Sequence, residues 1–246
     1  MLHAYVPGTL WSQSLEADVA RVLSHHGAEL PVPPVTVEQR NWNEAWEEKV
    51  MPVTVGEFRI RASWHRAGDS NTLKEIVIDP KMSFGTGHHE TTRLVLRLLA
   101  DVMEPGVSVL DAGSGTGVLA IGAALLGASS VLAFDTDRWS VENGTENIRR
   151  NGVEGVVTYR PGGIETARPG AYDVILANIN RTTLCEMMGA FAEMLSRDGR
   201  VVLSGVLRSD VVPMISAIEV AGCYVELEMT EGEWWAAVVR PVSWPS

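Results

Sequence analysis

The sequence has few cysteines and no long apolar run. Its two cysteines, Cys185 and Cys223, belong to no metal-type or redox-type pair, which excludes a disulfide framework and favours buried thiols in a reducing compartment. No stretch of about 18 uninterrupted apolar residues occurs, so no transmembrane helix is expected. The opening residues MLHAYVPGTLWSQS lack the basic and apolar regions of a secretory signal. These absences predict a soluble, cytoplasmic protein.

Positive charge is also scarce. The chain has 20 lysines and arginines against 31 acidic residues, a formal net charge of −11. Such a surface repels DNA or a long RNA and attracts cationic partners, so we expect no direct binding of nucleic acid and no membrane association. Acidity also keeps a protein in solution whatever its partner. The charge therefore agrees with a basic protein partner without establishing one.

The first third of the chain looks like a small unit followed by a connector. Its 246 residues, 46% of them hydrophobic, suffice for one large α/β core and an appendage. Helical spacing predicts a helix that ends at Gly27, and prolines then interrupt the chain. The predicted elements are a helix at 14–27, strands at 35–39 and 58–63, and an acidic helical stretch at 42–50. We interpret residues 1–40 as an α+β domain, 41–73 as a connector and 74–246 as the large domain.

From residue 74 onward, apolar strands alternate with amphipathic helices. This alternation is typical of a wound, mostly parallel sheet covered by helices. The last two strands are joined by a short linker containing Gly232, which predicts an antiparallel hairpin at one edge. The predicted strands are 75–79, 108–113, 131–135, 156–160, 173–179, 200–206, 224–229 and 234–239, and the predicted helices are 89–102, 117–126, 138–150, 183–195 and 209–221.

A glycine-rich loop follows the predicted strand at 108–113. Gly113, Gly115 and Gly117 allow the backbone to turn sharply and to approach a ligand, with the first N–H groups of the next helix free to bind it. We therefore expect a nucleotide site. Val118 replaces the third glycine of a nicotinamide fingerprint, which disfavours a dehydrogenase. Asp111 is expected to accept hydrogen bonds from a ligand amino group or to orient the loop.

Polar residues lie where the following strands end. Asp135 is expected at a strand tip, where its carboxylate can accept both ribose hydroxyls, whereas Asp137 is assigned to cap the next helix. Gly163 and Ile164 follow near the position that often flanks an adenine base. Asn178 ends a later strand and offers an uncharged acceptor for an amine hydrogen, although shaping a turn is the commoner task of an asparagine.

The polar segment PKMSFGTGHHETTR, at 80–93, predicts a lid. Phe84 would cover a ligand, Gly85 and Gly87 would give mobility, and Thr91 or Thr92 would offer a hydroxyl.

Two adjacent histidines, His88 and His89, lie in the same segment. They have no clustered third ligand, so no metal site is expected. Either remains a candidate proton acceptor, although capping or surface roles are commoner.

Several motifs are shared with one known family. They run from about Asn41 to the C-terminus and are NWNEAWEEKVMPV, FRIRASWH, IDPKMSFGTGHHETTRL, VLDAGSGTGVLAI, FDTD, NGV, ILANI, LSGV and EGEWW. The segment FGTGHHETT is the most specific, whereas the glycine loop is common to many methyltransferases. The chain resembles the enzymes that methylate protein eleven of the large ribosomal subunit. The resemblance implies an α/β, Rossmann-like class I methyltransferase with a seven-stranded, mostly parallel sheet, an antiparallel C-terminal hairpin and, here, a shortened N-terminal recognition domain.

The resemblance also implies an activity. The cofactor would be S-adenosyl-L-methionine, and the products would be methylated, in this family trimethylated, α-amino and lysine ε-amino groups of the ribosomal protein. It assigns Asn178, beside the methyl group and the amine, both to catalysis and to cofactor binding, and it assigns Thr92, Gly113 and Asp135 to the cofactor. The remaining residues expected at the cofactor are Phe84, Gly85, Thr86, Asp111, Gly115, Thr136, Gly163 and Ile164. Because the front domain is short, another protein or a small-molecule amine remains an alternative acceptor, and a non-catalytic cofactor sensor is a further one.

Overall fold

The described part of the chain comprises residues 12–27, 51–68, 72–79, 81, 83–169 and 171–242 of a computed structural model. The chain divides into two compact units, Met1–Val50 and Met51–Ser246. In the first unit, α1 (Gln13–His25) begins at Ser12, whose side chain accepts a hydrogen bond from Leu15 N. This confirms the helix expected at 14–27. The elements expected at 35–39 and 42–50 lie outside the described residues.

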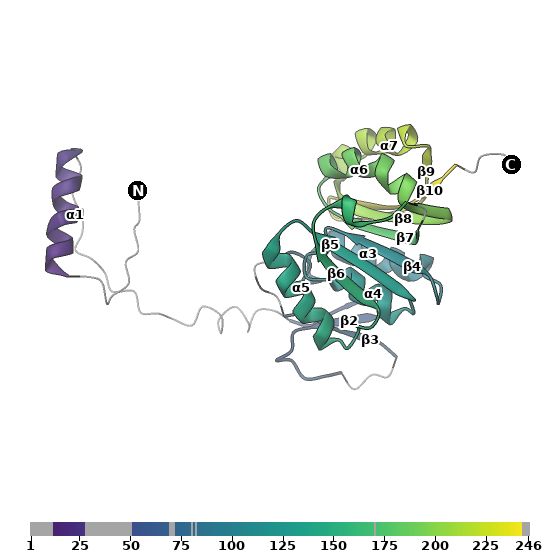
Figure 1. The fold of residues 1–246 in the computed structure, drawn as a ribbon, viewed down its shortest axis with the longest axis horizontal. Coiled ribbons are helices and arrows are strands. Elements are labelled where there is room, and N and C mark those ends of the chain that lie inside the picture. The colour runs from purple at the N-terminus through teal and green to yellow at the C-terminus, as the bar shows by residue number, and fades with distance from the viewer. Residues whose placement is uncertain are drawn as a thin grey trace. The chain divides into compact units, whose positions relative to one another are not determined.

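The second unit contains a seven-stranded sheet in the order β6-β5-β4-β7-β8-β10-β9 (Figure 1). Neighbouring strands from β6 to β8 run parallel, and β10 pairs antiparallel with both β8 and β9. The expected mostly parallel sheet with a C-terminal antiparallel hairpin is thereby confirmed. The strands are β4 (Ser108–Ala112), β5 (Ser130–Asp135), β6 (Val157–Pro161), β7 (Tyr172–Asn178), β8 (Leu195–Leu207), β9 (Cys223–Glu231) and β10 (Trp234–Pro241).

Helices cover both faces of this sheet. Two clusters of buried hydrophobic side chains form, one on each face. One cluster includes residues of α3 (Glu90–Val102), α4 (Val118–Leu125) and α5 (Arg138–Arg150). The other includes residues of α6 (Arg181–Met194) and α7 (Val211–Val220), which lie on the opposite side in Figure 1. Short 3-10 turns occur at Ile164–Thr166 and Arg208–Asp210. The core therefore has the three-layer arrangement that the alternating pattern predicts.

A second, three-stranded sheet packs against the first cluster. It consists of β1 (Val53–Val55), β2 (Phe58–Arg61) and β3 (Lys74–Val77), with β2 and β3 parallel. The expected strand at 75–79 therefore forms, but it pairs with β2 rather than joining the large sheet. Phe58 and Ile76 are fully buried in the cluster that α3 and α4 share. Asn151, after α5, donates to Val77 O and accepts from Val77 N, both at 2.8 Å, which satisfies the free edge of β3.

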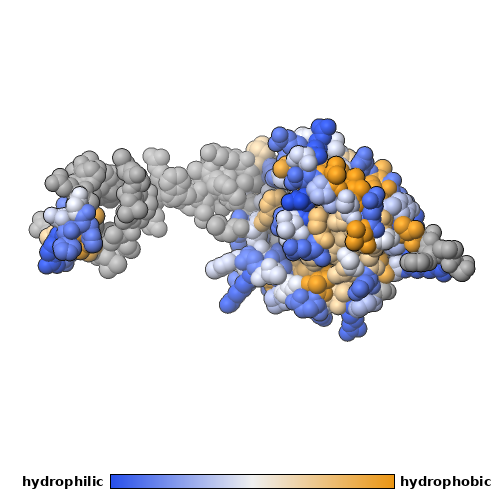
Figure 2. Space-filling view, turned by 90° about the horizontal axis from the view of Figure 1, so that it is seen from above, coloured by the Kyte–Doolittle hydropathy of each residue, from blue (hydrophilic) through white to orange (hydrophobic). Residues whose placement is uncertain are grey.

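The surface of the larger unit mixes polar and hydrophobic side chains (Figure 2). Single exposed hydrophobic residues are ordinary on a protein surface, and Val220, Val212 and Trp139 are of this kind at 89%, 74% and 70% exposure. Phe84, 55% exposed, differs from these because it lines a cavity. No helix in the described ranges has the length and apolar character that crossing a membrane requires.

Replacing Phe58 by alanine tests whether the small sheet belongs to the same cooperative unit. Phe58 is fully buried against the large-sheet helices, so Phe58→Ala should lower the free energy of unfolding by about 3–5 kcal/mol in a urea titration. Trp64→Ala, at a residue 40% exposed, is the control and should cost under about 1 kcal/mol. Equal, small effects would show that the sheet folds independently.

Candidate active site

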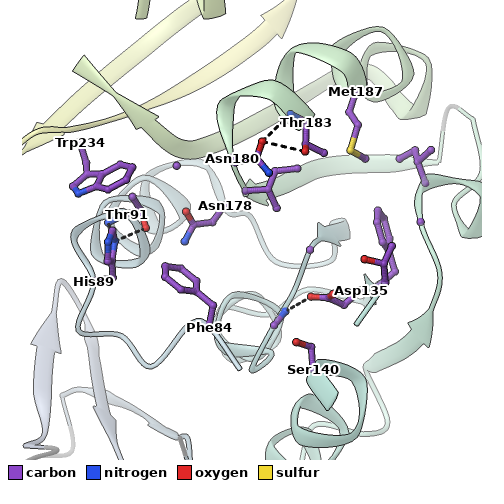
Figure 3. A pocket seen from close by; sticks show the side chains of 18 residues that line it. Phe84, His89, Thr91, Asp135, Ser140, Asn178, Asn180, Thr183, Met187 and Trp234 are labelled. Carbon is purple, nitrogen blue, oxygen red and sulfur yellow. Dashed lines mark hydrogen bonds between the residues drawn. The ribbon is translucent and has the colours of Figure 1, made fainter. Parts of the chain in front are cut away.

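A cavity of about 610 Å³ lies at the carboxyl ends of the parallel strands (Figure 3). Gly113 follows β4, Asp135 ends β5, and Asn178 ends β7. Ligands of wound α/β sheets bind at this edge, because the strand-to-helix loops meet there. Of the residues predicted for the site, Phe84, Gly113, Gly115, Asp135, Thr136, Gly163, Ile164 and Asn178 line the cavity. Gly85, Thr86, Thr92 and Asp111 do not appear in its lining.

The backbone N–H groups of the glycine loop are already hydrogen-bonded. Each of the five from residue 113 to residue 117 donates to a protein oxygen at 2.9–3.0 Å. Neighbouring loops supply most of the acceptors. Of the N–H groups at the start of the next helix, which the sequence predicts to be free, those of Gly117 and Ala120 are bonded to Ser114 O and Asp111 Oδ2. The acceptors are Phe134 O for residues 113 and 114, Asp135 Oδ2 for residue 115, Phe84 O for residue 116 and Ser114 O for residue 117.

The glycines of the loop instead allow neighbouring segments of the protein to approach it closely. A Cβ atom at Gly113 would lie 2.4 Å from Ile179 Cγ2, and one at Gly115 would lie 2.4 Å from Phe84 O. Both glycines have positive φ, at 70° and 55°, which other residues rarely adopt. Tyr159 Oη donates to Gly115 O at 2.8 Å, and burial raises the pKa of this tyrosine, so it stays a donor. The loop is thus fixed from several sides.

Asp111 lies beneath the loop and is fully buried. Its Oδ2 accepts hydrogen bonds from Ser114 Oγ at 2.5 Å and Ala120 N at 3.1 Å. Of its two expected roles, orienting the loop is the one seen. Desolvation raises the pKa of Asp111 to about 7, since the two hydrogen bonds offset only part of the burial penalty.

Asp135 forms one end of the cavity. Its Oδ2 accepts from Gly115 N at 3.0 Å and its Oδ1 accepts from Asp137 N at 2.9 Å. Each carboxylate oxygen has room for a further donor, because a carboxylate accepts about four hydrogen bonds. Asp137 instead accepts from Ser140 N at 3.0 Å and caps α5, as predicted. These bonds to Ser140 hold the pKa of Asp137 below its ordinary value.

The segment predicted as a lid is held against the glycine loop. Thr116 donates through its backbone N to Phe84 O at 2.9 Å and through Oγ1 to Gly85 O. Gly85 and Gly87 have φ of 103° and 85°, and a Cβ at Gly87 would lie 2.5 Å from Ile60 Cδ1. These glycines are needed for this conformation, whereas the sequence suggested that they provide mobility.

The histidines of this segment have structural partners. His89 caps α3, since its Nδ1 accepts a hydrogen bond from Thr91 N at 3.3 Å. A backbone N–H can only donate, so the neutral ring carries its proton on Nε2 and cannot accept one there. His88 Nε2 contacts Met51 O at 2.8 Å. The second nitrogen of His88, Nδ1, lies 3.3 Å from Thr86 Oγ1. Both rings therefore have hydrogen-bond partners among the described residues. No metal-type cluster occurs among the described residues.

Asn178 lies between the two ends of the cavity (Figure 3). Its Nδ2 donates to Thr92 Oγ1 at 3.4 Å, which directs the amide and leaves Oδ1 without a donor among the described residues. Thr92 thus contacts Asn178 from outside the cavity, and Thr91 lines it in its place.

Several lining residues escaped the sequence analysis. They are contributed by α6 and its N-cap, by β8 and by β10, far along the chain, and include Asn180, Thr183, Met187, Gly205 and Trp234. The motif EGEWW contains Trp234, but nothing in the sequence alone places the start of β10 beside α3. Among the described lining residues, Asp135 is the one aspartate, glutamate, lysine or arginine, and His89 is the one histidine.

Comparison with known proteins identifies the family. A family model described as ribosomal protein L11 methyltransferase matches residues 3–241. The chain belongs to this family. A relative of that name from Porphyromonas gingivalis is 34% identical over 98% of this chain and 84% of its own length. Another of that name, from Chlorobaculum tepidum, is 34% identical over 98% of this chain and 85% of its own length.

Solved structures agree with the fold. The ribosomal protein L11 methylase of Lactobacillus delbrueckii subsp. bulgaricus superposes with a TM-score of 0.72 at 27% identity, over 77% of this chain and 98% of that one. A tRNA methyltransferase of B. subtilis reaches a TM-score of 0.53 at 17% identity, over 60% of this chain and 65% of its own, and shows the shared fold alone. Members of this class I methyltransferase family use S-adenosyl-L-methionine.

The buried carboxyl group beneath the loop gives a pH-dependent stability. The pKa of Asp111 rises from 3.8 to about 7 on folding, so its contribution is fully present below about pH 4 and is lost as the pH rises through 7. Across that window, urea unfolding should show the wild type losing up to about 4 kcal/mol relative to Asp111→Asn, which cannot titrate. A stability difference that stays constant from pH 4 to 8 would contradict this.

Proposed function

We propose that this protein transfers methyl groups from S-adenosyl-L-methionine to amino groups of ribosomal protein L11, in the cytoplasm. The acceptors would be the α-amino group and lysine ε-amino groups, and each would be carried to the trimethyl form. Family membership and the names of the relatives support this assignment. The observation that carries it is the placement of Asn178 in a part of the cavity that has no carboxylate, lysine or arginine in its lining, while the other end holds Asp135.

The residues of the cavity suit a nucleoside without phosphates. A phosphate-bearing cofactor needs free backbone N–H groups or cations, whereas the N–H groups of residues 113–117 are bonded and Asp135 is anionic. Ribose hydroxyls instead suit the Asp135 carboxylate, which faces the cavity. We assign the methionine part to the surface of Gly113 and Gly115, and the adenine to the region of Gly163 and Ile164. Phe84 and Thr136 complete this cofactor-binding wall.

The bound cofactor would supply a methyl group on a positively charged sulfur. The amine nitrogen would attack the methyl carbon in line with the carbon–sulfur bond, and the sulfur would leave as a neutral thioether. The amine must present a free lone pair, so the side chains have to favour its neutral form. A lysine with an ordinary pKa near 10.4 loses its proton more readily where it is desolvated and no carboxylate lies beside it. The surroundings of Asn178, which include no carboxylate, meet this requirement, and the proton leaves to solvent before transfer.

Asn178 then orients the amine. Its Nδ2 is engaged with Thr92, so its Oδ1 can accept an N–H and direct the lone pair toward the methyl group. No base is required in this scheme. The capping role of His89 agrees with it.

Replacing Asp135 and Asp137 by asparagine, one at a time, distinguishes cofactor binding from helix capping. Asp135→Asn should weaken S-adenosyl-L-methionine about 10- to 100-fold in calorimetry, because hydrogen bonds to a charged acceptor contribute about 1.5–3 kcal/mol. Asp137→Asn is the matched control: Asp137 caps α5 without lining the cavity, and asparagine caps equally well. Its cofactor affinity should stay within about twofold. Similar affinities for both variants would contradict the ribose assignment.

Removal of the amide tests the catalytic assignment. With labelled S-adenosyl-L-methionine and purified ribosomal protein L11, the wild type should label the protein, and Asn178→Ala should lower kcat about 100-fold, the usual effect of losing one oriented polar group. Calorimetry should find the cofactor Kd nearly unchanged. Wild-type enzyme that binds the cofactor but leaves L11 unlabelled would refute the substrate, and an unchanged kcat in Asn178→Ala would refute the role of Asn178.

A further inference from the structure

Three aromatic side chains line the cavity on the side away from Asp135. In Figure 3, His89 and Trp234 lie to the left of Asn178 and Phe84 lies below it, whereas Asp135 lies to its right. The His89 ring contacts Phe84 with centroids 5.3 Å apart and Trp234 with centroids 4.9 Å apart, both edge-on. The rings belong to two distant parts of the chain, the 83–89 segment, which carries Phe84 and His89, and the start of β10, which carries Trp234. They form one aromatic wall beside Asn178.

An ion-pair cluster holds this wall together. Arg93 donates from Nε and Nη2 to Glu231 Oε1, at 2.8 and 2.5 Å. Glu231 is the cross-strand partner of Trp234. The same guanidinium donates from Nη1 to His88 O, the carbonyl just before His89. One side chain, 19% exposed, therefore joins the hairpin that carries Trp234 to the peptide that carries His89.

A second arginine completes the cluster. Arg97 Nη1 donates to Glu231 Oε2 at 2.6 Å but not to the 83–89 segment. Burial alone would raise the pKa of Glu231, but the hydrogen bonds and charges of Arg93 and Arg97 outweigh it and keep the pKa below its usual value. The carboxylate therefore stays ionised, and its ion pairs with Arg93 and Arg97 persist across neutral pH.

Repeated methylation changes what an acceptor site must hold. A primary neutral amine has two N–H groups, a monomethylated amine has one, and a dimethylated amine has none. Asn178 Oδ1 can therefore orient the first and second transfers but has no hydrogen to accept before the third. The quaternary product is a permanent cation, and the faces of aromatic rings attract such cations by about 0.5–2 kcal/mol.

We propose that Trp234 is a specificity-determining residue for the number of methyl groups, because its ring holds the methyl groups that Asn178 cannot bind. This inference rests on the proposed function. Each transfer breaks the sulfur–methyl bond and forms a nitrogen–carbon bond with the lone pair of the neutral amine. The resulting ammonium loses a proton to solvent before the next transfer, and the third product has none to lose.

Product distributions measure this directly. Ribosomal protein L11 is incubated with excess S-adenosyl-L-methionine, and mono-, di- and trimethylated forms are followed by mass spectrometry. Trp234→Leu should slow the third transfer about tenfold more than the first, so that dimethylated protein accumulates. Trp234→Phe keeps an aromatic face and should restore most of the third transfer. Trp139→Leu, at an exposed tryptophan outside the cavity lining, should match the wild type.

A second pair of variants tests the bridge that Arg93 forms between Glu231 and His88 O, and leaves Trp234 unchanged. Arg93→Lys cannot bridge Glu231 and His88 O together, and it should shift the products toward dimethylated protein in the same way as Trp234→Leu. Arg97→Lys is its control, because Arg97 contacts Glu231 but not His88 O. It should leave the product ratio unchanged. These variants also decide the matter if Trp234→Leu does not fold.

The possible outcomes distinguish a failure of the inference about Trp234 from a failure of the proposed methylation of ribosomal protein L11. If wild-type protein labels no L11, the proposed function fails. If it labels L11 but stops before the trimethylated form, or if Trp234→Leu slows all three transfers equally, the role of Trp234 is overturned. Retention of the wild-type ratio in both Trp234→Leu and Arg93→Lys would overturn it as well.

Discussion

The hydrogen bond from Gly115 N to the Asp135 carboxylate joins the two strand ends around which the cavity is built. It draws an acidic side chain against a loop that has no side chains of its own at Gly113 and Gly115. Asp111 supports the same loop from below through Ser114 and Ala120. Because every partner is protein, the shape of the loop is set before any ligand arrives. Binding of a ligand therefore costs little conformational entropy for ordering the walls of the site.

This constraint extends to the neighbouring segment. Thr116 donates twice to residues 84 and 85, so Phe84 is positioned by the loop that it covers. From there the contacts continue through His89 to Trp234 and the Arg93–Glu231 pair. Elements separated by more than a hundred residues in sequence thus form one continuous wall. Asn178 projects into the space between this wall and Asp135 (Figure 3).

Much of this arrangement could be predicted from the sequence. The alternating strands and helices, the C-terminal hairpin and the cap at Asp137 follow from local periodicity and side-chain chemistry. The carboxyl ends of parallel strands meet at one edge, so the order of strands and loops along the chain was enough to expect Asp135 and Asn178 near each other. Local patterns did not reveal the acceptors of the loop N–H groups or the pairing of β3 with β2. Both depend on contacts between distant segments, as does the position of Trp234.

The occupied N–H groups of the glycine loop also bear on competition among metabolites. Adenine nucleotides and dinucleotides share the base and sugar of a sulfonium nucleoside and abound in every cell. Their phosphates would meet bonded amides and the negative Asp135, where neither attraction nor solvation compensates them. We therefore expect such molecules to bind more weakly than a sulfonium nucleoside, because Asp135 repels their phosphates and the N–H groups of residues 113–117 already have acceptors. A loop whose hydrogen bonds are turned inward would thereby discriminate between ligands that its glycines alone could not tell apart.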